Sequence, residues 1–280
     1  MTPHVALRFA LVLATAAAVQ GLRAQVPPVG VRALVEHVTV APGARTGVAV
    51  RLDVPAGWYI DWINPGSTGL PTTLTWRAPA GLSAGPTAWP FPERVEADRE
   101  VSHVLRGTVY AVTPFRAEAT ARPGRYELRA TLSWLLCSGN CVRQQSTLAV
   151  PLRIARGPAT RSGEWVEVEA TAHAFPVAGD GLTFRAVGEA GGVRLEIGGL
   201  QGAPPTGSAV TFFPTRQGRS AVVVPLRTAG GVVTVTLPED FVEGALSSRL
   251  SGVLVGLLVR GGAVRSRALA VDVPLTAPER

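Results

Sequence analysis

The stretch SWLLCSGNCVRQQ (residues 133–145) contains both cysteines of this 280-residue chain. Residues 125–136, which lead into it, alternate between polar and apolar side chains, and residues 148–154 after it alternate in the same way. A period of two is the pattern of a strand with one buried face. The Ser-Gly-Asn sequence at residues 138–140 predicts a three-residue hairpin loop in which Gly139 takes a positive φ. The stretch therefore predicts a β-hairpin with a cysteine on each side of its turn.

The phase of the two strands places both cysteines on one face of this hairpin. Counted from the core-facing even-numbered residues of the first strand, Cys137 points outward, and counted back from Leu148, Cys141 points outward too. Residues that flank a three-residue loop face each other on one side of the ribbon, so the two sulfurs are positioned to bond. We therefore predict a redox-active cysteine pair at the hairpin tip.

A structural disulfide is the alternative interpretation of the same two residues. In the loop-closure model, a cross-link that closes a five-residue loop stabilises by roughly 2 kcal/mol, compared with about 4.5 kcal/mol for a hundred-residue loop. Many secreted β-proteins nevertheless carry short-loop disulfides. The cysteine spacing alone leaves both interpretations open.

The N-terminal residues are typical of a secretory signal. His4 and Arg8 precede an apolar run over residues 9–19, and residues 21–24 include small side chains suited to cleavage. The run is too short to span a bilayer. We expect a signal peptide over residues 1–24 and export to a bacterial periplasm, with a retained N-terminal anchor as the alternative. An oxidising compartment allows a disulfide to persist.

Charge and hydropathy exclude several classes of function. The formal net charge is +7, and every basic side chain among the Lys and Arg count is an arginine. These arginines are scattered and form no basic run, which argues against nucleic-acid binding. The longest later apolar run, residues 250–259, is too short for a transmembrane span and predicts a buried strand.

Composition and turn signals predict an all-β protein. The chain contains 31 glycines and 23 prolines, and short alternating runs are separated by turn-forming residues. This pattern is typical of a β-sandwich. Residues 156–163 lack an apolar pattern and form the predicted linker between a first domain, residues 25–155, and a second, smaller, β-sandwich-like domain, residues 164–280. The strands predicted in that second domain cover residues 164–171, 182–187, 193–197, 209–213, 221–226, 232–237, 253–259 and 269–273, with one short helix at 238–246.

The sequence supports little chemistry other than thiol–disulfide exchange. His37, His103 and His173 are too few and too dispersed to complete a zinc site with two cysteines. Soft thiolates favour Cu(I), so a copper ion held by Cys137 and Cys141 is a further alternative. No serine-hydrolase elbow, phosphate-binding loop or zinc-protease motif is present in the sequence.

Four tryptophans in the first domain allow two interpretations. They could line a carbohydrate groove, although packing in the core of a sandwich is the commoner reason for such residues. The tryptophans are Trp58, Trp62, Trp76 and Trp89.

Three motifs in order resemble a known family. GWYIDWINPGSTGLPTTLTW (residues 57–76), AGPTAWPFPER (84–94) and SWLLCSGNCV (133–142) resemble the periplasmic N-terminal region of the transmembrane thiol:disulfide reductases DsbD and ScsB. The resemblance covers the first domain throughout. It covers the second more weakly, through TFFPTRQG (211–218) and LSGVLVG (250–256).

The resemblance implies an immunoglobulin-like first domain with a protein-disulfide reductase function. Its cysteine pair would take electrons from a membrane-embedded partner and reduce periplasmic proteins such as disulfide isomerases or peroxiredoxins, with no bound cofactor and no metal. Carried over by motif, Cys141 forms the mixed disulfide with a partner and Cys137 resolves it. Arg143 could favour the attacking thiolate, with a solvated arginine as the alternative.

The sequence departs from the family pattern at two places. Ser67-Thr68 replaces the Asp-Ser of the family's NPGDSG motif, and residues 103–105 (His-Val-Leu) replace an aromatic segment expected to shield the sulfurs. Because the chain has no predicted membrane helix after the signal, we expect a separate membrane protein to donate the electrons. The residues expected to form a partner-binding or shielding surface are Trp58, Tyr59, Asn64, Phe91 and His103.

A non-enzymatic function is the main alternative. In it the chain is a periplasmic protein-binding or assembly module, Cys137–Cys141 is a static clip, and the tryptophan-rich loops contact the partner.

Overall fold

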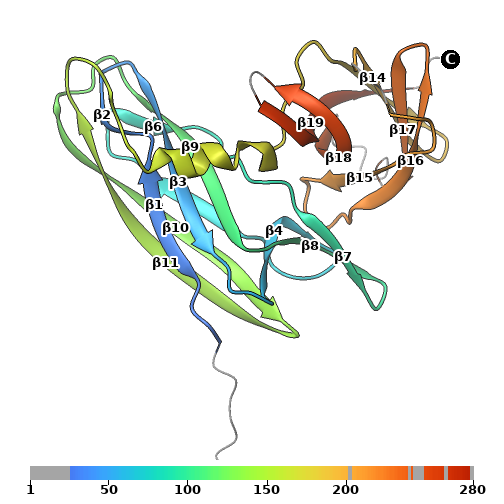
Figure 1. The fold of residues 1–280 in the computed structure, drawn as a ribbon, viewed down its shortest axis with the longest axis horizontal. Helices are drawn as coiled ribbons and strands as arrows, with labels where there is room; N and C mark the ends of the chain where they lie inside the picture. Colours follow the sequence, from blue (N-terminus) through green and yellow to red (C-terminus); the bar gives the residue numbers. More distant parts are fainter. Residues whose placement is uncertain (1–25, 201–203, 239–240, 242–248, 262–263, 278–280) are drawn as a thin grey trace, which may run out of the picture.

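The computed structural model describes residues 26–200, 204–238, 241, 249–261 and 264–277. Strands form nearly all of the regular structure in these residues, and they build a sandwich followed by a barrel (Figure 1). The predicted all-β fold, a sandwich followed by a second β-domain, is confirmed. The predicted signal peptide, residues 1–24, and most of the predicted helix at 238–246 lie outside the described residues.

The strands of the first domain are β1 (Gly30–Val35), β2 (His37–Val40), β3 (Arg45–Asp53), β4 (Tyr59–Gly66), β5 (Thr73–Arg77), β6 (Leu82–Ala84), β7 (Glu93–Ala97), β8 (Glu100–Leu105), β9 (Thr108–Ala117), β10 (Gly124–Ser138), β11 (Asn140–Ile154) and β12 (Thr160–Arg161). They form two sheets. One has the order β1-β3-β9-β6, and the other has the order β12-β2-β11-β10-β4-β8-β7, with β5 also paired to β10.

The long hairpin β10–β11 dominates the second sheet and follows the predicted alternation. The two strands pair in unbroken register from Gly124↔Ile154 to Ser138↔Asn140. Gly139 in the turn has φ +78°, as predicted. The apolar side chains of one phase lie in the core between the sheets: Leu128, Ala130, Leu132, Trp134, Leu136, Val150, Leu152 and Ile154.

The segment after the hairpin differs from the prediction. Residues 156–163 do not separate two domains, because β12 pairs with β2 of the first domain. Residues 164–171, predicted as a strand, instead contain helix α1 (Trp165–Ala170), followed by the short 3₁₀ helix η1 (Ala172–Ala174). Trp165 and Val168 of α1 pack on the outer face of the β1-β3-β9 sheet. The apolar residues of this segment therefore bury one helical face, which alternation over so short a run could not reveal.

The second domain is a closed barrel and not the predicted sandwich. Its strands are β13 (Thr183–Glu189), β14 (Gly192–Gly198), β15 (Ala209–Pro214), β16 (Val222–Ala229), β17 (Val232–Pro238), β18 (Arg249–Gly261) and β19 (Val264–Thr276). The order is β13-β14-β17-β16-β15-β18-β19, and a parallel pairing of β13 with β19 closes it. Sandwich and barrel strands share the same period of two, so only the pairing of these distant strands distinguishes the two architectures.

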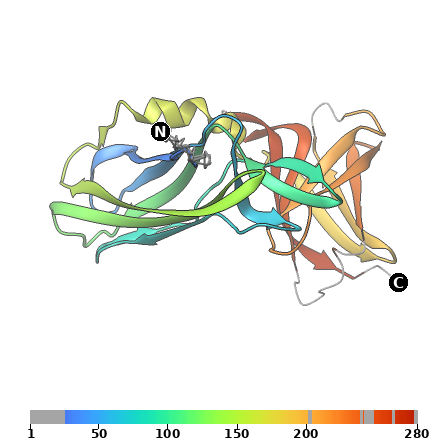
Figure 2. The same cartoon turned by 90° about the horizontal axis from the view of Figure 1, so that it is seen from below.

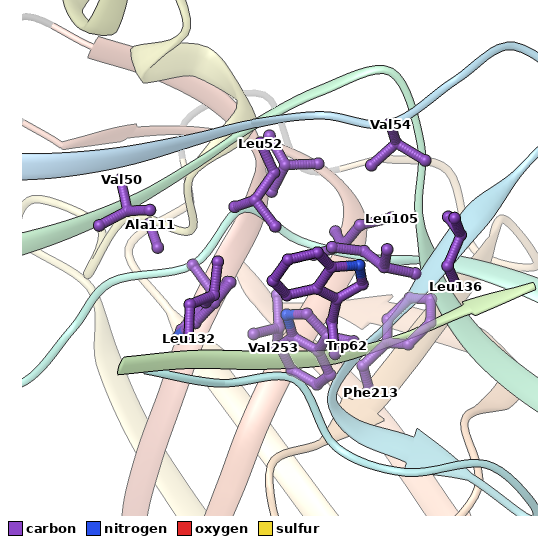
Figure 3. Packing of buried hydrophobic residues seen from close by; sticks show 14 of the residues in the cluster. Val50, Leu52, Val54, Trp62, Leu105, Ala111, Leu132, Leu136, Phe213 and Val253 are labelled. Carbon is purple, nitrogen blue, oxygen red and sulfur yellow. The ribbon is translucent and has the colours of Figure 1, made fainter. Parts of the chain in front are cut away.

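The sandwich and the barrel lie against each other (Figures 1 and 2). Residues of both domains form one hydrophobic core. Figure 3 shows Phe213 and Val253 of the barrel beside Trp62 of the sandwich. The rings of Trp62 and Phe213 meet edge to face with centroids 6.4 Å apart. Of the two interpretations of the four tryptophans, the structure shows packing in the core: Trp62 and Trp89 are buried, and Trp58 and Trp76 pack partly buried against this cluster. Within the described residues, no helix is long and apolar enough to cross a membrane.

Candidate redox site

Cys137 and Cys141 form a disulfide at the tip of the β10–β11 hairpin. The two residues are direct cross-strand neighbours, and their Cα atoms lie 4.1 Å apart. Such a short Cα separation belongs to a pair that does not exchange backbone hydrogen bonds, where side chains on one face lie closest. The hairpin register therefore brings the sulfurs together, as the sequence predicted.

The two cysteines differ sharply in exposure. Cys141 is exposed, whereas Cys137 is only 1% exposed although its register places it on the outward face. The neighbouring strands explain the difference. Tyr59 of β4 lies directly opposite Cys137 on the side away from Cys141, whereas no described strand other than β10 pairs with β11 at Cys141. One sulfur is therefore accessible and the other is covered.

Tyr59 contacts an arginine that the sequence analysis did not identify. The guanidinium of Arg106 lies 5.0 Å from the centre of the Tyr59 ring, which is a cation–π distance. Arg106 also forms an ion pair with Glu93 at 3.3 Å. The register of β4 with β8 brings these residues together, since Ile60 pairs with Leu105. No sequence motif signals such a cross-strand contact.

Arg143 shares the face of the two cysteines. It lies two residues after Cys141, opposite Leu135, and its side chain is exposed. Arg143 is therefore free to approach a partner that docks at Cys141. Its effect on the thiolate stays a prediction.

The predicted shielding residues do not form one surface. Of the five, Tyr59 lies beside the disulfide. Trp58 and Phe91 are partly buried against the core shared by the two domains, and the Phe91 N–H donates to the Ala174 carbonyl at 3.0 Å. Asn64 and His103 are completely buried at the junction with the barrel, where they cannot contact an external partner.

The Asn64 side chain joins the two domains through its amide. Its Nδ2 donates to the carbonyls of Pro214 at 2.7 Å and Arg219 at 2.8 Å, both in the second domain. Its Oδ1 accepts the Gly66 N–H at 3.2 Å. Gly66 has φ +95°, and a Cβ there would lie 2.1 Å from the Val101 carbonyl oxygen, so this position of the NPG motif requires glycine.

His103 completes the same junction with both ring nitrogens. The Ala221 N–H donates to Nε2 at 2.7 Å, which leaves Nδ1 as the donor to the Asn64 carbonyl at 2.7 Å. Burial lowers the pKa of His103 to about 4, the positive charge of Arg94 acts in the same direction, and the hydrogen bond to Asn64 opposes both. The neutral ring is therefore a structural part of the junction.

Asp61, between these two regions on β4, is a buried acid. Its Oδ2 accepts the Leu70 N–H at 2.9 Å. Burial raises the pKa of this carboxyl to about 6, although the hydrogen bond from Leu70 opposes the shift. Asp61 thus binds a proton more tightly in the folded protein than a solvated aspartate does.

The described residues contain no cluster of three or more histidine, cysteine or acidic side chains suited to a metal ion. His37, His103 and His173 lie on different elements: β2, β8 and η1. The sulfurs of Cys137 and Cys141 are bonded to each other, so only the reduced form could offer two thiolates to copper.

Comparison with known proteins places the first domain in a family. Residues 31–152 match the model of the N-terminal domain of the thiol:disulfide interchange protein DsbD. No curated protein sequence matches this chain.

Two solved structures resemble this chain to different degrees. The N-terminal periplasmic domain of ScsB from Proteus mirabilis has a TM-score of 0.54 and 18% identity, over 88% of this chain and 93% of that one, which shows a shared fold. The major pilin subunit BcpA of Bacillus cereus covers 90% of this chain and 69% of its own at 8% identity, but its TM-score of 0.30 is too low for a comparison of folds. The sandwich that carries the Cys137–Cys141 disulfide therefore matches the DsbD N-terminal family model over residues 31–152, and the chain shares the fold of the ScsB domain.

Proposed function

We propose that this chain is an exported thiol–disulfide exchange module that passes reducing equivalents to other exported proteins through Cys137 and Cys141. The observation that supports this best is the unequal exposure of the bonded pair, with Cys141 exposed and Cys137 1% exposed, in a domain of the DsbD N-terminal type. Exchange needs one sulfur that a partner can reach and a second that waits to resolve the intermediate. A structural disulfide needs neither an accessible sulfur nor a resolving one.

The reaction starts from the dithiol form. The Cys141 thiolate attacks one sulfur of a disulfide in an exported partner, and the partner's other sulfur leaves as a thiolate that takes up a proton. The Cys137 thiolate then attacks Sγ of Cys141. The mixed disulfide breaks, the partner's second thiolate is released and protonated, and the Cys137–Cys141 bond forms. Two electrons and two protons pass to the partner.

The fold supplies the geometry for the second step. The hairpin holds the Cα atoms of Cys137 and Cys141 4.1 Å apart, so the resolving attack is intramolecular and needs no further encounter. Tyr59 covers Cys137 on its other side and limits attack on it by solvent thiols. The exchange needs no cofactor beyond the cysteines. Reduction of the disulfide requires a dithiol from another protein, which we assign to a separate membrane electron donor.

Trapping the mixed disulfide tests this function. The reduced Cys137→Ser protein, mixed with an oxidised thioredoxin-like disulfide isomerase, should form a covalent adduct that dithiothreitol reverses. The matched Cys141→Ser protein should form at least about tenfold less adduct, because its remaining thiol is covered. Adduct formation by neither variant, or equally by both, would favour the binding-module function. Tight Cu(I) binding by the reduced wild type without adduct formation would favour copper handling.

A further inference from the structure

We propose that the groove between β1 and β11 docks an extended, acidic segment of a partner protein, which pairs with β11 as an added strand. This inference goes beyond thiol exchange, because docking there does not require a redox-active disulfide. Four observations support it: a free strand edge, an apolar groove beneath that edge, uncompensated positive charge at its rim, and direct continuity with Cys141.

Among the described strands, none pairs with the outer edge of β11 over most of its length. β2 pairs with β11 only at Arg153 and Ile154. Cys137 and Cys141 form a non-hydrogen-bonded pair, so the backbone N–H and C=O groups of Cys141 point away from β10. The same orientation recurs at every second residue of β11. The odd-numbered residues 141–149, all exposed, therefore turn their N–H and C=O groups toward the free edge. Pro151 has the same phase and lacks an N–H, which is tolerated on an edge strand.

Two adjoining hollows, both lined by Val31, form a groove under this edge, between the two sheets of the sandwich. One end is lined by Val31 and Ala33 of β1 and by residues 148–153 of β11. The other end, toward the hairpin tip, is lined by Val29, Trp134 and residues 144–146. An added strand would place alternate apolar side chains in this groove, in contact with residues that are already part of the core.

Trp134, which lines the tip end of the groove, carries an unsatisfied donor. Trp134 is 4% exposed, and its Nε1 is the one buried side-chain nitrogen or oxygen atom without a hydrogen-bond partner in the described part of the chain. Buried polar groups in folded proteins normally have partners. An inserted segment could supply the missing acceptor through a backbone carbonyl.

The rim of the groove carries a net positive charge, since its acidic residue, Glu164, is paired with Arg32. Arg125 and Arg153 both line it and are directly opposite each other across β10 and β11. Like charges in this arrangement repel, and neither guanidinium has an acidic or hydrogen-bonding partner within the described residues. Arg143 adds a third exposed charge toward the tip. The fitting occupant is therefore a polypeptide in which acidic and apolar residues alternate.

The edge leads directly to the reactive sulfur. Cys141 is the first of the edge residues whose backbone groups are free, so a strand paired along residues 143–149 extends toward the disulfide. A partner held in this way would present its own disulfide to Cys141 in a fixed register. The docking groove would thus select partners before any exchange occurs.

Peptide binding tests the proposal on the oxidised mature protein. The probe is a fluorescein-labelled peptide in which valine and glutamate alternate, and binding is followed by anisotropy. One control peptide carries lysine in place of glutamate. The other carries N-methyl groups on the alternate amides that would face β11. We expect the glutamate peptide to bind at least about tenfold more tightly than either control.

Two sets of variants locate the site. Ala149→Pro removes a free-edge N–H that β10 does not use and should weaken binding at least about tenfold, while the matched Ala149→Val variant should bind within about twofold of the wild type. The double variant Arg125→Glu/Arg153→Glu, whose backbone is unchanged, should prefer the lysine peptide. Equal binding by Ala149→Pro and the wild type, an unchanged preference in the double variant, or no binding of any peptide would overturn the proposal. Because these measurements use no thiol chemistry, they can fail or succeed independently of the trapping experiment.

Discussion

The hairpin tip and the domain junction both contact strand β4, but they differ in how polar and reactive groups are treated. β4 begins with Tyr59 beside the disulfide and carries Asn64 against the barrel. At the junction, Asn64 and His103 are completely buried and every polar atom of their side chains is hydrogen-bonded. At the tip, Cys141 is exposed and the strand edge next to it is free. The motif at residues 57–66 therefore has two functions. Asn64 fixes the two domains together, and Tyr59 borders the disulfide.

Substitution of the cysteines should have the largest effect, and only on exchange. Cys141→Ser should form at least about tenfold less mixed disulfide than Cys137→Ser, which should accumulate the adduct. Both variants lose the same short cross-link, so both should lose a similar stability of roughly 2 kcal/mol. Non-reducing electrophoresis and thermal unfolding provide the two measurements. A much larger loss of stability in one variant would indicate a structural role for that cysteine instead.

At the junction, Asn64→Ala should strongly destabilise the fold. It removes three hydrogen bonds, including those that the carbonyls of Pro214 and Arg219 accept from the Asn64 amide, at a cost of about 3 kcal/mol. For a chain of this size the melting temperature should fall by roughly 6–12 °C. The midpoint potential of the disulfide should not change, because the loss is confined to the junction. A shifted potential with an unchanged melting temperature would reverse the roles assigned to the two regions.

His103 should make the junction sensitive to acid. Its pKa is lowered from the ordinary value of 6.5 to about 4, so the unfolded chain binds the proton more tightly and stability falls as pH drops from about 6.5 to 4. The free energy of unfolding that is lost over this pH range through His103 is about 3 kcal/mol. His103→Gln should be less stable than the wild type at pH 7, and this deficit should shrink by that amount toward pH 4. Urea unfolding at each pH measures the difference, and a deficit independent of pH would contradict the buried neutral ring.

Asp61 should act in the opposite direction over the same range. Its pKa is raised from 3.8 to about 6, so its extra stability is fully present below pH 3.8 and is lost as pH rises through about 6. The free energy of unfolding of Asp61→Asn, relative to that of the wild type, should therefore increase by about 3 kcal/mol between pH 4 and pH 7. The same urea series measures this gain. A gain that appears on acidification would show that the carboxyl is ionised in the fold.

The smallest effect is expected for Arg106 at the tip. Arg106→Ala removes the cation–π contact with Tyr59 and the exposed ion pair with Glu93, which together are worth about 1 kcal/mol or less. In the reduced protein, alkylation of Cys137 should accelerate severalfold while that of Cys141 stays constant. Arg106→Lys, which keeps the charge, should show a smaller acceleration. Equal acceleration at both cysteines would mean that Tyr59 does not selectively cover Cys137.

Local periodicity in the sequence was sufficient to predict where most strands lie. Alternation located β10, β11 and most strands of the barrel, and the motifs identified the family of the first domain. It could not predict features that depend on pairing between distant segments. The closure of β13 on β19 makes a barrel, and the pairing of β4 with β10 buries Cys137 although its phase is outward. Asn64 and His103 were assigned to the tip because the family resemblance placed their segments around the sulfurs, whereas their partners, Pro214 and Ala221, lie in the other domain.

The midpoint potential of the Cys137–Cys141 couple tests the central claim most directly. The mature protein would be equilibrated in graded thiol redox buffers, alkylated and weighed by mass spectrometry. We predict a value between about −180 and −270 mV, the range of isomerases, glutaredoxins and thioredoxin, in which the pair exchanges electrons with cellular partners. A value well below about −300 mV would mark a structural disulfide and contradict the proposed exchange function.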